Sequence, residues 1–224
     1  MSSPVNYTAV EMTAEELEAE RVLFGGLADS VRALADASLR TTVSAEVVAE
    51  VQAEIERATA RLSEQQIPGP FGVSLSSEGH VRGHGNAVVG LRNPVAPPLQ
   101  VEKSAEGRSW SSFHLGALYE GPPGMVHGGV AALVLDQMLG EAAAAGGSPG
   151  MTGTLELRYV QNTPLGDCSG GAWIDRVEGV KTIVKGELRR ADGECTVQAS
   201  GIFILPRWAR EVLAESEQKP PRFE

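Results

Sequence analysis

The chain has 224 residues, of which 42% are hydrophobic, and a formal net charge of −10. This hydrophobic content supports a packed core and excludes a generally disordered chain. The acidic excess argues against binding to nucleic acid or to anionic membrane surfaces, which carry charge of the same sign. It does not exclude a small anionic ligand, because a local pocket of backbone N–H groups and a few basic side chains can hold one.

Residues 1–66 are predicted to form a helical arm that holds most of the negative charge, with twelve acidic and five basic residues. Thr13-Ala-Glu-Glu16 matches a capping box, and apolar residues then recur at helical intervals. Gly25-Gly26 is a weak point in this first helix. A second helix is predicted to begin after Ser44. The arm can cap a site, build an oligomer, or do neither.

Location in the cell is predicted from the amino-terminal segment and the cysteines. Residues 1–20 are polar and acidic and lack the basic and apolar regions of a secretory signal. Cys168 and Cys195 are expected to be reduced. The apolar stretch 128–147 is interrupted by acidic and amide residues, so it is predicted to be a buried helix and not a membrane span. We therefore expect a cytoplasmic protein.

Residues 67–98 are rich in glycine and proline and are predicted to form a connector with one short strand. His80 and His84 are four residues apart, a spacing that can supply half of a metal site on a helix. Three glycines surround them and disfavour a helix. They are therefore expected to be loop histidines, and no metal site is predicted.

Residues 99–206 follow a different pattern, with two strands, one apolar helix and four more strands. The helix is expected from about residue 128 to 145. The last three strands are joined by short turns that include Asp192-Gly193, which favours hairpins. The predicted strands are 99–103, 109–118, 151–159, 170–177, 181–190 and 195–205. A curved antiparallel sheet wrapped around one helix buries that helix, which predicts an α+β fold. Residues 207–224 are predicted to be a tail that is frayed from residue 218.

Asp136 is the unexpected residue of this helix, because it lies in a run of aliphatic side chains. A buried carboxylate must be paired, hydrogen-bonded or functional, since burial of an isolated charge is costly. Asp136 is therefore a candidate general base. The alternative is that Asp136, Gln137 and Glu141 form a narrow polar edge that faces water.

The start of the same helix is a candidate oxyanion site. Gly128 and Gly129 lack Cβ atoms, so that a ligand can approach the backbone closely. The first N–H groups of a helix have no internal partner and can hold a developing negative charge. The alternative is that the glycines only form a tight turn. His127 precedes them and can donate to a substrate or make a structural hydrogen bond.

Spacing separates the two candidates. Asp136 lies seven residues beyond Gly129, which is roughly 10 Å along a helix. A carbonyl group held at the start of the helix is beyond the reach of Asp136 of the same chain. Two antiparallel copies of the helix, related by a two-fold axis, would place each Asp136 near the glycines of the other copy. A homodimer is therefore predicted.

The chain resembles the hotdog thioesterase superfamily over residues 99–206, and within it the branch of the phenylacetate-pathway thioesterases and the human thioesterase-superfamily members. The resemblance rests on Leu115-Gly116-x-x-Tyr-Glu-Gly-Pro-Pro-Gly124-x-x-His127-Gly-Gly129-x6-Asp136, followed by Met151-Thr152-x-Thr154-Leu-x-Leu-x-Tyr159 and Thr163-Pro-Leu-Gly166. It implies a hotdog fold and homodimers, often paired into tetramers, with the active site between two subunits.

The resemblance also implies roles for individual residues. It makes Asp136 the general base or nucleophile, uses the Gly128 N–H to polarise the thioester carbonyl, and gives Thr152 the task of orienting water. Several relatives have an amide side chain six residues before the histidine, where this chain has Gly121. A second oxyanion donor is therefore not provided at that position.

The sequence thus predicts an acyl-CoA thioesterase that releases a fatty or aromatic acid and CoA, without a metal or any cofactor apart from the CoA of its substrate. The catalytic residues are predicted to be Asp136, Gly128, Thr152 and His127. The residues expected to bind substrate are Gly129, Val130, Val134 and Met138 along an apolar channel, and Arg158, Arg189 or Arg190 at the nucleotide phosphates. Each arginine can instead be a solvated strand residue. The rivals are a hotdog acyl-CoA hydratase or dehydratase and a non-catalytic acyl-CoA-binding sensor.

Overall fold

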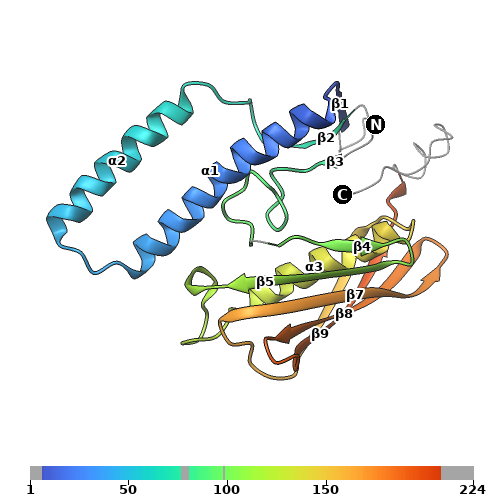
Figure 1. The fold of residues 1–224 in the computed structure, drawn as a ribbon. Coiled ribbons are helices and arrows are strands. Elements are labelled where there is room, and N and C mark those ends of the chain that lie inside the picture. The colour runs from blue at the N-terminus through green and yellow to red at the C-terminus, as the bar shows by residue number, and fades with distance from the viewer. Residues whose placement is uncertain (1–6, 77–80, 98, 208–224) are drawn as a thin grey trace.

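The computed structural model describes residues 7–76, 81–97 and 99–207. Figure 1 shows a six-stranded sheet packed on helix α3, with the helical arm on the other side of that helix. The connector runs between the two parts. Among the helices that the structure describes, none has an apolar stretch of the length that a membrane span requires.

The arm contains strand β1 (Tyr7–Val10) and helices α1 (Ala14–Arg40) and α2 (Ala45–Ser63). The predicted capping box at Thr13 is confirmed, because its hydroxyl accepts from the Glu16 N–H and the Glu16 carboxylate accepts from the Thr13 N–H. Helix α1 continues through Gly25-Gly26. Gly25 is buried, and an added Cβ would lie 3.0 Å from Leu91 Cδ1, so glycine permits close packing there.

The connector contains two short strands, β2 (Val73–Ser76) and β3 (Val81–Arg82), where one was expected. They join β1 in a three-stranded sheet in the order β1-β2-β3, with β1 parallel to β2. This pairing joins segments more than sixty residues apart, which local sequence patterns do not reveal. His84 lies in a loop, as expected, and His80 lies outside the described residues.

The large sheet has the strand order β4-β5-β7-β8-β9-β6, and all its pairings are antiparallel. Its strands are β4 (Glu102–Ser104), β5 (Arg108–Leu115), β6 (Met151–Tyr159), β7 (Gly166–Glu178), β8 (Lys181–Arg190) and β9 (Cys195–Ile204). A 3-10 turn, η1 (Ala117–Tyr119), follows β5. Strand β7 begins four residues earlier than predicted, because residues 166–169 pair with the end of β5.

Helix α3 (Gly128–Ala145) is the centre of the core. Its buried residues recur every three or four positions and face the sheet. They are Ala131, Val134, Leu135, Met138, Leu139, Ala142 and Ala143. One helix buried against a wrapped antiparallel sheet is the predicted α+β hotdog fold, which is thereby confirmed.

Strand β6 follows α3 in the chain but lies at the edge of the sheet, where it pairs with β9. Its outer edge pairs with no other strand in the described part of the chain. Large side chains remain exposed along it, including Met151 at 55% and Tyr159 at 54%. A long edge strand with exposed apolar residues is a surface suited to pairing with another chain.

Of the predicted tail, only Arg207 is described, and the frayed end predicted from residue 218 lies outside the described residues.

Candidate active site

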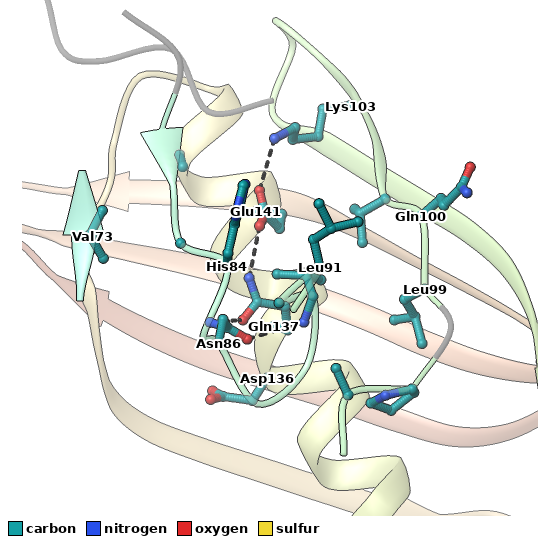
Figure 2. Close-up of a pocket in the computed structure, with 18 of the residues that line it drawn as sticks. Val73, His84, Asn86, Leu91, Leu99, Gln100, Lys103, Asp136, Gln137 and Glu141 are labelled. Atoms are coloured by element: carbon teal, nitrogen blue, oxygen red, sulfur yellow. Dashed lines mark hydrogen bonds and ion pairs between the residues drawn. The ribbon is translucent and has the colours of Figure 1, made fainter. Parts of the chain in front are cut away.

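A cavity of about 830 Å³ lies between α3, the connector and α1. This is within the usual size range of small-molecule sites. Figure 2 shows the residues of α3 and of the connector that face one another across it. Helix α3 contributes Asp136, Gln137, Gly140, Glu141 and Ala144, and α1 contributes Leu17, Arg21, Gly25, Asp29 and Arg32.

Asp136 is half-buried and lines this cavity together with Thr152. The Thr152 hydroxyl donates a hydrogen bond of 2.9 Å to Asp136 Oδ1. The structure therefore brings together two of the residues predicted to be catalytic. The polar edge that was the alternative for Asp136 also exists, and it faces the cavity.

His127 is the N-cap of α3, and its Nδ1 accepts a hydrogen bond of 3.0 Å from the Gly129 N–H. This is the structural interaction that was the alternative for His127. The Gly129 N–H is occupied by it, whereas the Gly128 N–H donates to no acceptor among the described residues. Tyr159 Oη donates a hydrogen bond of 2.9 Å to the Gly128 carbonyl, which fixes this peptide from the other side.

The loop before His127 leaves no room for a side chain at Gly121. A Cβ atom added there would lie 2.7 Å from His127 Cα. The Gly121 N–H donates to the Met125 carbonyl at 2.9 Å, which keeps the loop tight. An amide at this position would need a shifted backbone, so the departure from the relatives is built into the loop.

The two predicted half-sites lie at different places on one chain. Helix α3 is continuous from Gly128 to Ala145. The seven residues between Gly129 and Asp136 therefore separate them by roughly 10 Å along the axis. One chain assembles Asp136 with Thr152, and Gly128 with Tyr159, but does not bring the two pairs together.

Val134 and Met138 were expected to line an apolar channel, and the structure places both in the core instead. Neither side chain has any exposed area, and Val130 packs against that core. Met138 points to the sheet, since a Cβ added at Gly170 would lie 2.6 Å from its sulfur. These side chains lie on the face of α3 that contacts the sheet, whereas the cavity borders the adjacent face.

A chain of polar side chains lies in the cavity wall, and of its members only Gln137 and Glu141 were anticipated from the sequence, as a polar edge. Lys103 Nζ lies 3.0 Å from Glu141 Oε2, and Gln137 Nε2 donates to Glu141 Oε1 at 2.7 Å. Asn86 Nδ2 reaches Gln137 Oε1 at 3.4 Å. The signal available was the pair Gln137 and Glu141, one helical turn apart in an apolar helix. Asn86 and Lys103 lie in other segments and carried no local signal.

The connector is held between α1 and the hotdog domain by several contacts. The Arg92 guanidinium lies 3.4 Å from the centre of the Phe24 ring, and Arg32 donates to the Ala96 carbonyl at 3.1 Å. Asn86 Oδ1 accepts from the Val88 N–H at 2.7 Å. These contacts make the connector a wall of the cavity.

The arginines predicted to meet CoA lie elsewhere. Arg189 pairs with Glu187, and Arg190 pairs with Asp192 and Glu194. Arg158 is exposed, and it points away from α3, since its neighbour Tyr159 reaches α3 and strand side chains alternate. All three therefore have the environment of solvated strand residues.

Both cysteines are free thiols, as expected. Cys168 is buried and Cys195 is partly buried. Burial raises the pKa of both thiols, which keeps them in the unreactive neutral form. Neither thiol lines the cavity.

Comparison with known proteins includes a match over most of the chain. A solved thioesterase superfamily protein superposes with a TM-score of 0.72 and 34% sequence identity, covering 81% of this chain and 94% of that chain. The hotdog domain makes up about half of this chain. The match therefore extends beyond it, into the amino-terminal half.

No protein-family model matches the chain. Two of its curated relatives match over a shorter stretch. They are the acyl-coenzyme A thioesterases THEM4 of Xenopus laevis and Bos taurus, at 32% and 31% identity over 103 residues. The matched stretches cover 45% and 44% of this chain, and 46% and 41% of the relatives. This chain thus spans less than half the length of the curated relatives it matches.

Proposed function

Because the chain belongs to the thioesterase superfamily, we propose that it hydrolyses an acyl-CoA thioester to a free acid and CoA. The observation that carries this proposal is the hydrogen bond between Thr152 and Asp136 at the wall of the cavity. Two relatives named acyl-coenzyme A thioesterases support the substrate class. The reaction uses no metal and no cofactor, since CoA is part of the substrate.

In the proposed reaction Asp136 acts on the thioester carbonyl carbon, either through water or directly. As a general base it removes a proton from water, and the hydroxide adds to the carbonyl carbon. The tetrahedral intermediate then breaks its C–S bond, and the CoA sulfur leaves with the proton from Asp136. As a nucleophile, Asp136 would instead add to the carbonyl carbon and displace CoA thiolate, which breaks the C–S bond and leaves a mixed anhydride. Water then hydrolyses the anhydride to the free acid and the Asp136 carboxylate, and a proton from that water goes to the thiolate. Thr152 holds the carboxylate in place in both routes.

The carbonyl oxygen is proposed to bind the Gly128 N–H of a second copy of the chain. The separation along α3 makes this donor unavailable to Asp136 of the same chain. The exposed edge of β6 is the proposed contact between copies, and it carries both Thr152 and Tyr159. A homodimer, or a dimer of dimers, therefore completes two equivalent sites.

The first experiment measures release of free thiol from a panel of fatty and aromatic acyl-CoAs. Asp136→Asn is expected to lower kcat by about 10²–10⁴-fold, the usual contribution of general acid–base catalysis. Thr152→Ala is expected to lower kcat, and Thr152→Ser, which keeps the hydroxyl, to restore most of it. Asp192→Asn, at an exposed surface ion pair, is the matched control.

Full activity of Asp136→Asn would remove that residue from the mechanism. Binding of acyl-CoA without thiol release by the unaltered protein would favour a non-catalytic sensor. Addition of water to an unsaturated acyl-CoA would favour a hydratase.

The second experiment tests whether the site is shared. Gly128→Pro removes the proposed N–H donor at the first helical position, which suits the proline backbone. A Cβ at this position would lie 3.3 Å from Tyr159 Oη, so Gly128→Ala, which adds the Cβ and keeps the N–H, is the control. A mixture of Asp136→Asn and Gly128→Pro chains, refolded together, forms mixed dimers in which one site carries both lesions and the other none. Activity is expected to return in the mixture. If the mixture of the two variants stays inactive, the shared site is contradicted. Sedimentation of the active species as a monomer would contradict it as well.

A further inference from the structure

The cavity is lined by a continuous row of polar side chains from the connector, α3 and β4. We call its four residues the polar wall: Asn86, Lys103, Gln137 and Glu141. Figure 2 shows them as one chain of contacts that runs from the connector across α3 to Lys103, on the same side of the helix as Asp136. The wall thus begins next to the carboxylate proposed to be catalytic.

Fold stability does not explain the polar wall. The side chains of Lys103 and Glu141 are each 14% exposed. Removing two charges from water costs several kcal/mol per ion, and well-packed apolar residues of similar volume serve stability as well or better. An apolar wall would also suit a plain hydrocarbon chain. A polar wall in this place therefore indicates a ligand with a polar group.

The wall has hydrogen-bonding capacity to spare. Lys103 has three N–H donors and, within the described part of the chain, one acceptor, Glu141 Oε2. The Gln137 amide has a second N–H, since one bond to Glu141 is formed. Asn86 is fixed in orientation, because its Oδ1 accepts from the N–H groups of Val88 and Val89. Its NH2 group therefore faces α3.

Position along α3 sets where the ligand group must lie. Glu141 is five residues beyond Asp136, which is about 7.5 Å along the helix, and a straight acyl chain of about six carbons covers this distance. Gln137 is adjacent to Asp136 and reaches toward Glu141. An acyl chain that starts at Asp136 and follows α3 would bring its far end to Lys103 and Glu141.

We propose that the polar wall recognises a hydroxyl or oxo oxygen on the acyl group, so that the substrates are hydroxyacyl- or oxoacyl-CoAs of medium length. This inference rests on the proposed thioesterase function. A neutral oxygen fits because Lys103 and Glu141 balance each other in charge. A carboxylate at the chain end would be attracted by Lys103 but would also lie against the Glu141 carboxylate, and like charges repel.

The test compares hexanoyl-CoA with 6-hydroxyhexanoyl-CoA, flanked by shorter and longer pairs. The full-length protein is expected to favour the hydroxylated member in kcat/KM by about tenfold, the equivalent of about 1.4 kcal/mol. Gln137→Leu, and the paired change Lys103→Met with Glu141→Leu, are expected to reduce this preference to parity or reverse it. The paired change avoids leaving one charge buried alone. Gln198→Leu, at an exposed position of β9, is the matched control.

Binding gives a readout that is independent of turnover. The Kd values of both acyl-CoAs on the Asp136→Asn protein should show the same tenfold preference, and Gln137→Leu should abolish it. Equal Kd values and equal kcat/KM values for each pair would overturn the inference and leave the thioesterase proposal intact. No hydrolysis of any acyl-CoA would instead overturn the thioesterase proposal, and the binding ratio would still decide the role of the wall.

Discussion

The hotdog domain and the helical arm bury their apolar side chains to very different extents. Helix α3 has seven buried residues, and Leu135 and Leu139 have no exposed area. Helix α2 has no buried residue, and its apolar side chains are exposed, with Ile55 at 37% and Leu62 at 54%. Figure 1 shows α2 apart from the sheet, joined to α1 by a short loop.

This difference shows that helices with similar apolar periodicity can contribute very differently to the stability of the fold. An amphipathic helix gains most of its stability from packing of its apolar face. In one chain, α3 has that packing on the sheet, α1 has a smaller contact around Gly25 and Ala28, and α2 has none within the described residues. The stability of the fold is therefore expected to reside in the hotdog domain.

The largest effect is expected in α3. Leu139→Ala should lower the free energy of unfolding by about 2–5 kcal/mol, because it removes buried methyl groups and leaves a cavity. Urea denaturation measures this loss. Leu133→Ala, on the same helix but 37% exposed, should change stability much less. Similar losses at the two positions would contradict the assignment of the α3 faces.

A smaller effect is expected in the connector, which joins the two regions. A Cβ atom at Gly90 would lie 2.2 Å from the Asn86 carbonyl oxygen and 2.7 Å from that of His84. Gly90→Ala should therefore cost about 1–3 kcal/mol through overpacking. Gly83→Ala, with nothing near the added methyl group, is the control for thermal or urea unfolding. An unchanged midpoint for Gly90→Ala would show that the connector is not held as described.

In the arm, the cap of α1 should matter locally. Thr13→Ala removes the hydroxyl that accepts from the Glu16 N–H and should destabilise the start of α1 by about 1 kcal/mol. Hydrogen exchange of the α1 amides should then be about fivefold faster. Exchange in α3 should not change, because the two helices belong to separately stabilised regions. Faster exchange in both helices would contradict the separate stabilisation of the arm and the hotdog domain.

The same cap gives the arm a pH dependence. The hydrogen bond from the Thr13 N–H, followed by that from its hydroxyl, lowers the pKa of Glu16 from its ordinary value of 4.5. A lowered carboxyl pKa means that the ionised carboxylate stabilises the helix. This stabilisation is fully present above the pKa of the unfolded chain and is lost as the pH falls through the pKa of the folded chain. The protection of the amides at the start of α1, which is the intrinsic exchange rate divided by the measured rate, should therefore fall below about pH 4.5. Glu16→Gln should remove this dependence.

The smallest effect is expected in α2. Ile55→Ala should change the unfolding free energy by no more than about 0.5 kcal/mol in the single chain, because α2 has no buried residue and the substitution removes no core contact. Denaturation at two protein concentrations measures this. A loss above 1 kcal/mol that grows with concentration would mean that a second copy covers the α2 stripe.

Elements with local signals could be predicted from the amino-acid sequence. The α3 bounds, the hairpins of β7, β8 and β9, and the capping box at Thr13 follow from periodicity, turn residues and cap spacing. Asp136 stood out because a carboxylate in an apolar helix needs a reason. The family resemblance gave Thr152 the task of orienting water, and the structure adds that its hydroxyl contacts the Asp136 carboxylate.

The face of α3 that contacts the sheet, and the face that borders the cavity, could not be predicted from local sequence and depend on how distant segments pack. Val134 and Met138 were expected at the substrate because apolar side chains suit an acyl channel, but on a nearly all-apolar helix composition does not choose the face. The polar wall draws Asn86 from the connector, Lys103 from β4 and two residues from α3. Contacts between such distant segments leave no periodic trace in the sequence, because they depend on how the chain folds back on itself.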